Sequence, residues 1–386
     1  MYRRINLYKI ILSFFIFSVS LIASDIDIKT FGTIGATYND NSNYIHRKNT
    51  LQKSGSSDDL YFGTDSLVGI QGIYKINHNF TALLQSLAQK DYKNEIKVSI
   101  DSGYLRYEND NNLIVKLGRM RTPYYRNSDN QNIGYSKLLV REPIEVYGQV
   151  PFEGYDGIEL LYTDLLGDYF YNIQVSYGEE TFIAPIHSQN EEVEITLDNL
   201  YSANLTFGTS EVEIRATYMH GKISANNTMI DTIMSTLPAS LAREYELKNK
   251  SSYYLGFGIF IDYNNFIFNS EIGQRKVPSF YPDIKAIYAT AGYKIKNYTP
   301  YISFSQSKML QETQINTATA LDSFMAIQNL SQSTKSVGVK YFINKNIDLK
   351  FQYDHITPDG EYGGFYVGVK DPQTMNVYTL MLDFVF

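Results

Sequence analysis

A regular alternation of apolar and polar residues through most of the chain is the feature that most constrains its fold. In residues 347–354, Ile, Leu, Phe and Tyr alternate with Asp, Lys, Gln and Asp, and residues 169–177 and 211–218 show a similar pattern. A period of two is what a β-strand shows when the two faces of its sheet meet unlike surroundings. The sequence therefore predicts an all-β chain with one apolar face and one polar or charged face.

The connections between the predicted strands alternate in length. Seven short turns are expected near residues 77–79, 109–112, 165–168, 208–210, 263–265, 296–298 and 344–346. Eight longer polar connections are expected at 39–60, 90–96, 122–154, 179–194, 221–250, 277–284, 310–332 and 358–373. A soluble sandwich connects its strands with turns of mixed length, whereas this organisation is typical of bacterial outer-membrane barrels. We therefore predict a transmembrane antiparallel up-and-down β-barrel of sixteen strands, with short periplasmic turns and long external loops.

Residues 1–24 have the pattern of a secretory signal peptide. Three basic residues lie before or at the start of an apolar run over residues 10–23, and Ser24 offers a short side chain at the cleavage position. This run is short for a bilayer span, and an uncleaved anchor is the alternative interpretation. Cleavage leaves residues 25–386 as one barrel domain, enough for sixteen tilted strands of about ten residues around a water-filled lumen.

Composition argues against several classes of function. The absence of cysteine excludes disulfides, thiolate metal sites and a cysteine nucleophile. The five histidines are not spaced as metal ligands, and the sequence has no nucleotide-binding or hydrolase motif. The net charge of −7, about −10 after cleavage, argues against nucleic acid and weakly favours the attraction of cations. We therefore expect no enzyme activity, no cofactor and no metal.

The C-terminal segment places an apolar side chain at every second position and ends on an aromatic residue. The pattern consists of Tyr378, Leu380, Leu382, Phe384 and Phe386. It resembles the signal by which the barrel-assembly machinery recognises Gram-negative outer-membrane proteins. A buried edge strand that ends in Phe is the alternative. The 34 tyrosines fit the aromatic girdles of such barrels, although core packing explains them as well.

The third long connection, 122–154, is the longest and has an unusual composition. Pro123, Tyr124, Pro143, Tyr147 and Phe152 are rigid or bulky residues, which suit a loop that packs against a wall. The sequences Leu-Gly-Arg-Met-Arg-Thr-Pro at 117–123, Arg-Glu-Pro-Ile-Glu-Val-Tyr-Gly-Gln at 141–149 and Tyr-Asp-Gly at 155–157 flank or form it.

In these stretches, in strand count and in its C-terminus, the chain resembles the general trimeric, sixteen-stranded porins of Gram-negative outer membranes. The resemblance implies that the third loop folds into the lumen and forms an hourglass-shaped pore with a transverse electric field. It also implies a homotrimer in contact with outer-membrane lipid and lipopolysaccharide. The chain departs from the enterobacterial porins because its loop is rich in arginine and lacks their short acidic stretch.

The resemblance also suggests which charged residues form the constriction. The acidic candidates are Asp129, Glu142, Glu145, Glu153 and Asp156. The basic candidates on the facing wall are Lys29 and Arg106, and those near the loop are Arg119, Arg121, Arg126 and Arg141. Strict alternation along the strand would point Arg119 at lipid, so the strand must bend or end there. Plain solvated surface is the alternative for each residue.

Other charged residues are expected to face the lumen because they alternate with apolar neighbours. These are Lys116, Glu213, Arg215, Glu271, Arg275, Lys340 and Lys350. In two further loops, apolar residues at helical spacing predict helices within 231–245 and 318–330 that cover the pore mouth, with disorder as the alternative. Acidic residues 191, 192 and 194 either bridge to lipopolysaccharide through divalent cations or simply keep the loop soluble.

Charge at a narrow passage acts on permeating ions through fields that water screens weakly. The leading hypothesis is therefore an outer-membrane porin for passive diffusion of ions and small hydrophilic solutes, with a mild cation preference. The alternatives are a substrate-selective channel and a surface adhesin or structural barrel with a closed lumen.

Overall fold

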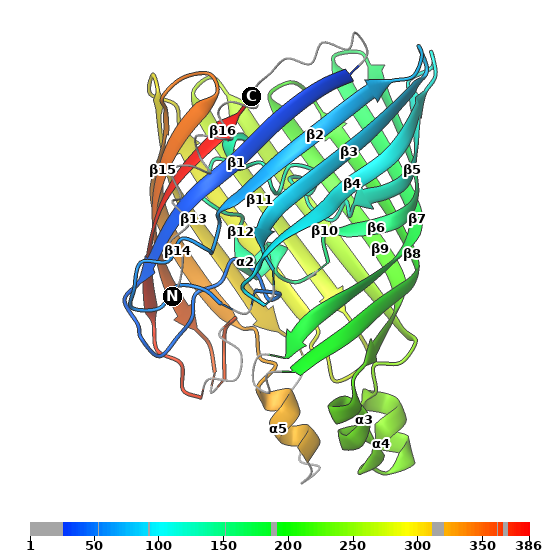
Figure 1. Cartoon of the computed structure of the whole chain (residues 1–386), viewed down its shortest axis with the longest axis vertical. Coiled ribbons are helices and arrows are strands. Elements are labelled where there is room, and N and C mark those ends of the chain that lie inside the picture. Colours follow the sequence, from blue (N-terminus) through cyan, green and yellow to red (C-terminus); the bar gives the residue numbers. More distant parts are fainter. Residues whose placement is uncertain are drawn as a thin grey trace, which may run out of the picture.

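A computed structural model describes residues 26–386 except for residues 53, 92, 151, 187–190, 311–319, 361 and 366–369. The predicted signal peptide lies outside the described residues. The described chain forms one closed barrel of antiparallel strands, in which each strand pairs with its sequence neighbours and β1 pairs with β16 (Figure 1). The predicted sixteen-stranded barrel is therefore confirmed.

The strands have the following bounds: β1 Ile26–Asn39, β2 Leu67–Lys75, β3 Phe80–Lys90, β4 Ile96–Glu108, β5 Leu113–Arg121, β6 Gly154–Leu166, β7 Tyr169–Ile186, β8 Glu191–Gly208, β9 Val212–Asn226, β10 Lys250–Tyr263, β11 Phe266–Lys276, β12 Ile284–Tyr293, β13 Tyr298–Met309, β14 Gln332–Phe342, β15 Ile347–Pro358 and β16 Met375–Val385. The helical segments are η1 Gly134–Ser136, α2 Ile144–Tyr147, α3 Thr228–Ser235, α4 Ala239–Tyr245 and α5 Ala320–Ala326.

The alternation in the sequence corresponds to the two faces of the barrel wall. Along β13, Thr299, Tyr301 and the serines at 303, 305 and 307 are buried, while the intervening residues are exposed on the other face. Ile302, on that outer face, is 64% exposed. In a bilayer no water is available to backbone groups, so a closed sheet that pairs every strand is the β-structure that can cross it. An apolar outer wall around a polar interior is what such a barrel requires.

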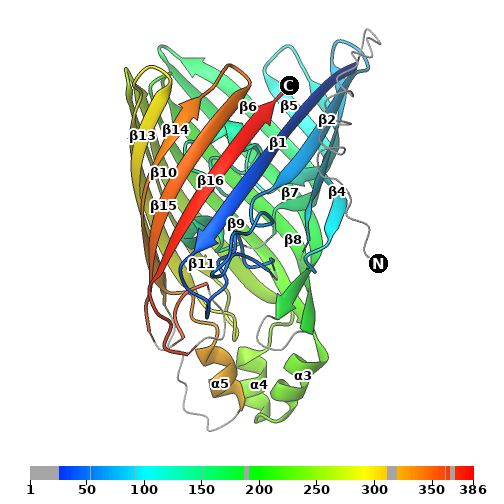
Figure 2. The same cartoon turned by 60° about the vertical axis from the view of Figure 1, so that its left-hand side comes forward.

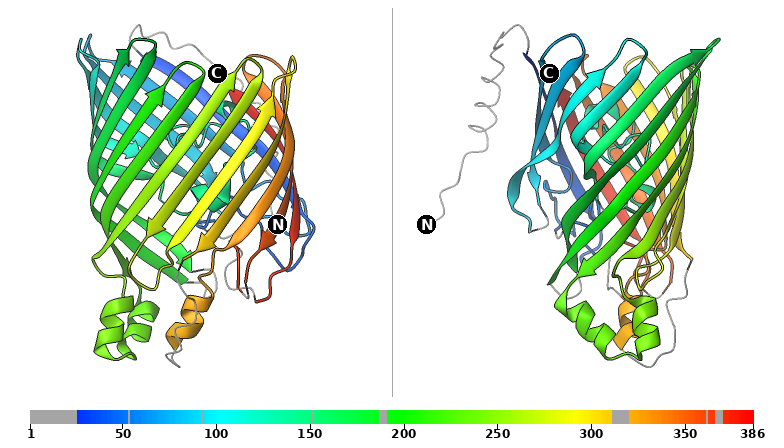
Figure 3. Two further views of the ribbon diagram at one scale, coloured as in Figure 1. Left: turned by 180° about the vertical axis from the view of Figure 1, so that it is seen from behind. Right: turned by 90° about the vertical axis from the view of Figure 1, so that its right-hand side faces the viewer.

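The two ends of the barrel differ. Figures 2 and 3 show short turns and the C-terminus at one end, and α3, α4 and α5 beyond the other. Some short turns use a left-handed residue, such as Asn264 with φ of 53° between β10 and β11. Asparagine tolerates this conformation better than most residues. No helix among the described residues is long and apolar enough to cross a membrane.

Helices form in the two loops where helical spacing predicts them. The predicted segment 231–245 contains most of α3 and all of α4, and α5 covers residues 320–326 within the second predicted segment. The Asn227 side chain accepts a hydrogen bond of 3.1 Å from the Ile230 amide, which caps the N-terminus of α3. Buried residues of α3 and α5, among them Ile230, Met234 and Phe324, pack in one apolar cluster at the barrel mouth.

The predicted long loop at 179–194 is wrong. Strand β7 continues to Ile186 and β8 begins at Glu191, so the connection is only residues 187–190, which lie outside the described residues. The acidic residues in this stretch suggest a polar loop, but they alternate with apolar residues. Phe182 and Ile195 belong to these strand extensions and pack against the interior apolar cluster. The extended hairpin therefore adds apolar surface inside the barrel.

Candidate functional site

The third loop, residues 122–153, lies inside the barrel and is the candidate functional site. Val140, Val146 and Gln149 are among its fully buried residues. Its helix α2 packs against β11, β12 and β13, and η1 packs against β16 (Figure 1). The loop leaves the wall after β5 and reaches strands far around the barrel, so it obstructs the lumen instead of extending outward.

The strand that leads into this loop is distorted at Gly118. This residue has φ of 134°, and a Cβ atom there would lie 2.4 Å from the carbonyl oxygen of Gly103 on β4. Only glycine fits a backbone this close with such a dihedral angle. The distortion comes directly before Arg119, where the alternation of the sequence requires a bend.

Arg121 joins the two ends of the loop to the wall. Its guanidinium lies 2.5 Å from Asp101 on β4 and 3.3 Å from Glu153, which precedes β6. The Nε atom donates to the carbonyl oxygen of Ser128 at 2.7 Å. With a side chain only 4% exposed, Arg121 is a buried cation whose partners are all supplied by the protein.

Arg119, in contrast, forms its ion pairs with wall strands. Its guanidinium lies 2.9 Å from Asp156 on β6 and 2.8 Å from Glu180 on β7. Asp156 is 60% exposed and pairs with Arg119 across adjacent strands. These two predicted constriction residues therefore form a local network between wall strands.

On the opposite side of the lumen, the loop residue Arg126 contacts two acidic residues of the wall. Arg126 Nε lies 3.3 Å from Glu213 on β9, and the Arg126 amide donates to Glu271 on β11 at 3.0 Å. Glu271 also accepts hydrogen bonds of 2.9 Å from the hydroxyls of Tyr147 and Tyr288. The polarity is the reverse of the expectation that loop carboxylates face wall cations.

Glu145, on α2, also departs from that expectation. It is buried and accepts hydrogen bonds from Ser305 at 2.8 Å, from Gln332 at 2.6 Å and from Thr334. These donors lie on β13 and β14 and are neutral. A buried carboxylate needs such donors to offset its loss of hydration, so Glu145 serves to attach α2 to the wall.

Arg141 attaches the loop to β16 and to the first long loop, residues 40–66. Its guanidinium lies 2.8 Å from Asp65, donates to Thr379 at 2.8 Å and to His46 Nε2 at 3.0 Å, and is 3.6 Å from Asp354. Burial and the Arg141 charge lower the pKa of His46 to about 3. Burial alone would raise the pKa of Asp65, but Arg141 holds it below its ordinary value. The first loop is thus a second obstruction in the lumen, which sequence reasoning missed because nothing in its composition distinguishes it.

Two wall lysines attach the η1 segment. Lys340 on β14 donates to the carbonyl oxygen of Tyr135 at 2.5 Å, and Lys350 on β15 donates to that of Gly134 at 2.6 Å. They also pair with Asp348 at 3.0 Å and with Asp383 at 2.9 Å, respectively. All four side chains are buried, so their charges are neutralised within the protein.

Between the two loops and the wall lies a polar cavity of about 50 Å³. Its charged lining residues are Lys48, Asp65, Lys137, Arg141 and Glu142. Burial lowers the pKa of Lys137 to about 8 and raises the pKa of Glu142 above its ordinary value. Charges of both signs therefore line this small cavity.

The remaining candidate residues differ in what they contact. Arg215 donates to the carbonyl oxygen of Pro123 at 2.9 Å, and Arg275 donates to that of Gln149, so both contact the loop from the wall. Lys116 pairs with Glu159 at 2.7 Å on the interior face. Asp129 is an exposed residue of the loop.

The expectation that Lys29 and Arg106 face the loop carboxylates is not met. Lys29 pairs with Asp27 at 3.3 Å and Arg106 with Glu108 at 2.8 Å, each within its own strand. Both lie near the short-turn end of the barrel, whereas the loop enters from the other end. Within the described ranges, no group of three or more His, Asp or Glu side chains is placed to hold a metal.

The fold has several known counterparts. The structure matches the outer-membrane channel DcaP of Acinetobacter baumannii with a TM-score of 0.59 and 12% identity, over 94% of this chain and 98% of that one. It matches OmpF of Salmonella typhi, solved with daunomycin, with a TM-score of 0.58 and 13% identity over 94% and 97%. An anion-selective porin of Comamonas acidovorans matches with a TM-score of 0.54 and 10% identity over 94% and 100%.

No protein-family model and no curated protein matches the sequence. At 10–13% identity the structural matches establish the fold. The residues of the third loop are therefore interpreted from their own geometry. The chain has the sixteen-stranded barrel fold of the Gram-negative outer-membrane porins.

Proposed function

We propose that this chain is an outer-membrane channel for passive diffusion of ions and small hydrophilic solutes. The observation that carries the proposal is a closed sixteen-stranded barrel whose lumen is narrowed by a loop bonded to the inner wall on several sides. A barrel of this size encloses an aqueous lumen, and a fixed internal loop limits the size of the solutes that pass.

We further propose that charged groups beside the loop set a weak selectivity. Asp129 is exposed and lies within electrostatic reach of Lys116 and Arg121, while Arg126 is 39% exposed beside Glu213. Arg121, Arg141, Lys340 and Lys350 are buried beside buried carboxylates and present little net field to an ion. The excess of acidic over basic residues in the chain supports a mild cation preference.

The proposed biological setting follows from the fold and from the sequence pattern. The N-terminal segment would be cleaved on export, the Tyr378 to Phe386 pattern would be recognised by the barrel-assembly machinery, and the barrel would reside as a homotrimer among outer-membrane lipid and lipopolysaccharide. Supporting observations are the outward, exposed positions of Tyr378 and Leu380 on β16 and the apolar outer wall.

A substrate-selective channel is the second candidate, because one observation favours it. An apolar cluster of α3, α5 and neighbouring loop residues lies at the long-loop mouth, where a general diffusion pore needs only polar surface. Hydrophilic solutes gain nothing from such a cluster. Competition of ion current by candidate solutes separates this function from general diffusion.

The test is reconstitution of the purified, refolded protein in a planar bilayer. We expect stepwise conductance in groups of three and, across a KCl gradient, a small reversal potential of cation-selective sign. Stable insertion without conductance would contradict the channel proposal and favour a structural or adhesive barrel. An anion-selective potential would retain the channel and assign the dominant field to the loop arginines.

A further inference from the structure

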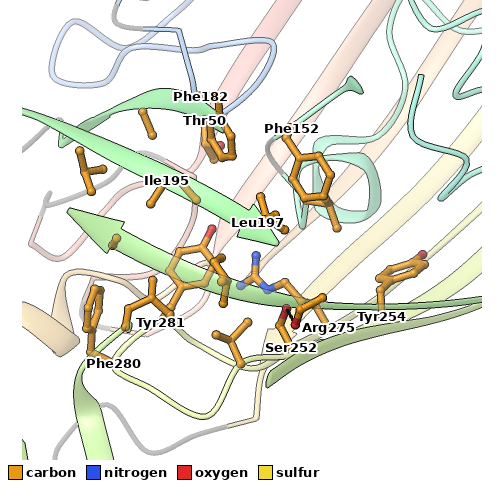
Figure 4. A pocket seen from close by; sticks show the side chains of 18 of the residues that line it. Thr50, Phe152, Phe182, Ile195, Leu197, Ser252, Tyr254, Arg275, Phe280 and Tyr281 are labelled. Carbon is orange, nitrogen blue, oxygen red and sulfur yellow. Dashed lines mark hydrogen bonds between the residues drawn. The ribbon is translucent and has the colours of Figure 1, made fainter. Parts of the chain in front are cut away.

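A second and larger cavity, of about 170 Å³, lies within the long-loop half of the barrel. It is bordered by the extended parts of β7 and β8, by β9 and β10, and by residues near the end of the third loop (Figure 4). Its lining includes Phe152, Phe182, Val193, Ile195 and Met219. Much of the barrel interior is polar, so a compact apolar cavity inside the wall calls for an explanation.

One charged side chain lies among these apolar groups. Arg275, on β11, is 5% exposed and lines the cavity together with Tyr281, whose ring centroid is 4.2 Å from the Arg275 Cζ atom (Figure 4). Its two terminal nitrogens donate to the carbonyl oxygens of Gln149 and, at 2.7 Å, of Pro282. These contacts fix the guanidinium at the boundary between the third loop and the cavity.

The Nε atom of Arg275 is buried and has no hydrogen-bond partner within the described part of the chain. A buried donor without a partner is unfavourable, and buried polar groups in folded proteins are nearly always paired. Carbonyl oxygens satisfy the other two nitrogens but do not neutralise the charge. Among the described lining residues there is no Asp or Glu, so the cavity carries an uncompensated cation.

The size and charge of the cavity together define a class of ligand. A cavity of about 150 Å³ lined by aliphatic and aromatic side chains is known to hold benzene, and this one is slightly larger. An oxyanion on the same molecule would accept from Arg275 and offset its charge. We propose that this cavity binds a small monocarboxylate with a single aromatic or compact aliphatic ring, of which benzoate is the simplest probe.

The apolar cluster at the mouth connects this cavity to the long-loop end of the barrel. Phe280 and Phe324 belong to that cluster and also line the cavity, so apolar surface continues from the mouth helices to Arg275. A ring-bearing acid could move along this surface while its carboxylate approaches the cation. The inference rests on the proposed channel function for access, and it names a substrate class for the second candidate function.

The first test is equilibrium binding to the full chain in lipid nanodiscs, which avoids competition from detergent. Benzoate, benzyl alcohol and acetate are titrated by calorimetry. We expect benzoate to bind at least about tenfold more tightly than benzyl alcohol, which lacks the charge, and than acetate, which lacks the ring. Equal affinity for benzoate and benzyl alcohol would overturn the role of Arg275, and equal affinity for benzoate and acetate would overturn the role of the cavity.

Two variants locate the site. Ala184→Phe fills the cavity from β7 without altering Arg275, and Ile183→Phe adds the same ring on the outer face of the same strand. Benzoate affinity should fall about tenfold or more in the first variant and change less than about twofold in the second. Unchanged benzoate binding in Ala184→Phe would show that the ligand binds elsewhere and would overturn the proposal.

The charge is tested separately with Arg275→Gln. We expect it to lose the preference for benzoate over benzyl alcohol while it retains binding of the alcohol. If this variant does not fold, the Ala184→Phe and Ile183→Phe pair still decides the proposal. Conductance of the same preparations is recorded without benzoate. Conductance without benzoate binding would overturn this inference alone, whereas binding without conductance would support the site and contradict the channel.

Discussion

The third loop is held by two sides of the barrel in different ways. Toward β14, β15, β16 and β1 it is fixed by buried charges, with Arg141, Lys340 and Lys350 as the cations. Toward β8 to β12 it packs largely through aromatic rings, such as Tyr125 set edge-on against Tyr254 of β10 with ring centroids 5.6 Å apart. The charged side responds to protonation and to the loss of one partner, whereas the aromatic side responds to the loss of volume. The same loop therefore combines an electrostatic and an apolar attachment.

The largest expected effect is on the charged side. Arg141→Ala leaves Asp65 and Asp354 buried without their cation, and loss of one partner of a buried ion pair typically costs about 3–5 kcal/mol. We expect a lower free energy of unfolding in urea with lipid vesicles, together with larger and noisier single-channel currents as the loop loosens. Lys29→Ala is the control, because its pair with Asp27 is exposed. Equal effects of the two variants would contradict the importance assigned to the charged side.

The next effect is on the aromatic side. Phe152 is buried between Tyr124 and Phe182, with ring centroids 5.3 and 6.0 Å away. Truncation in Phe152→Ala should cost about 3 kcal/mol through lost burial and a new cavity. Its effect on unfolding should be nearly independent of salt concentration, because no charge is involved. A strong salt dependence would mean that the two attachments are not separate.

Acid should weaken the charged side through His46. Its lowered folded-state pKa means that the folded protein binds fewer protons than the unfolded chain between pH 6.5 and about 3. The contribution of this group to stability should therefore decline as pH falls through that window, by about 1.4 kcal/mol per pH unit, and level off below it.

The measurement for His46 is urea unfolding at pH 7.5, 6 and 5. His46→Gln keeps an acceptor beside Arg141 but cannot titrate, so its stability should fall less steeply than that of the unmodified protein. Parallel pH profiles for the two proteins would rule out this histidine as the cause.

The smallest effect concerns ion selectivity. Asp129→Asn removes an exposed negative charge near Lys116 and Arg121, and should move the reversal potential in a KCl gradient a small step toward anion selectivity. Raising the ionic strength should reduce the difference, since the charge is exposed to water. Glu145→Gln, a buried change, should leave the potential unaltered. A larger shift in Glu145→Gln would place the permeation path along α2.

The sequence predicts the barrel well because its signal is local. A period of two and an alternation of short and long connections are visible within each strand and its neighbours, and they yield sixteen strands. The prolines and aromatic residues of the third loop predict that it packs against a wall, and the resemblance to the porins implies that this wall is the inside of the barrel. The hairpin of β7 and β8 is the exception, because clustered glutamates suggest a loop where the strands continue.

The pairing of charges could not be predicted in the same way. Arg141 and Asp65 are 76 residues apart, and Arg126 and Glu213 are 87 residues apart. Such partners are brought together by closure of the barrel, which sequence spacing does not encode. The negative charge of Glu145 suggests a cationic partner, but its partners are neutral hydroxyl and amide groups. The sequence shows that a carboxylate, if buried, needs hydrogen-bond donors. It does not show which residues provide those donors.

The seam between β1 and β16 gives the barrel an unusual folding problem. All the other strand pairings join strands that are consecutive in the sequence. At the seam, the Thr33 hydroxyl donates to Asp383, which is 350 residues away. Thr30 and Phe386 also exchange backbone hydrogen bonds of 2.8 and 2.7 Å. Contacts this distant in sequence carry the greatest loop-closure entropy and form late. Until then, two strand edges remain open to pair with other chains. Closure of the cylinder is thus the step at which folding competes with aggregation, and the residues at the seam decide that competition.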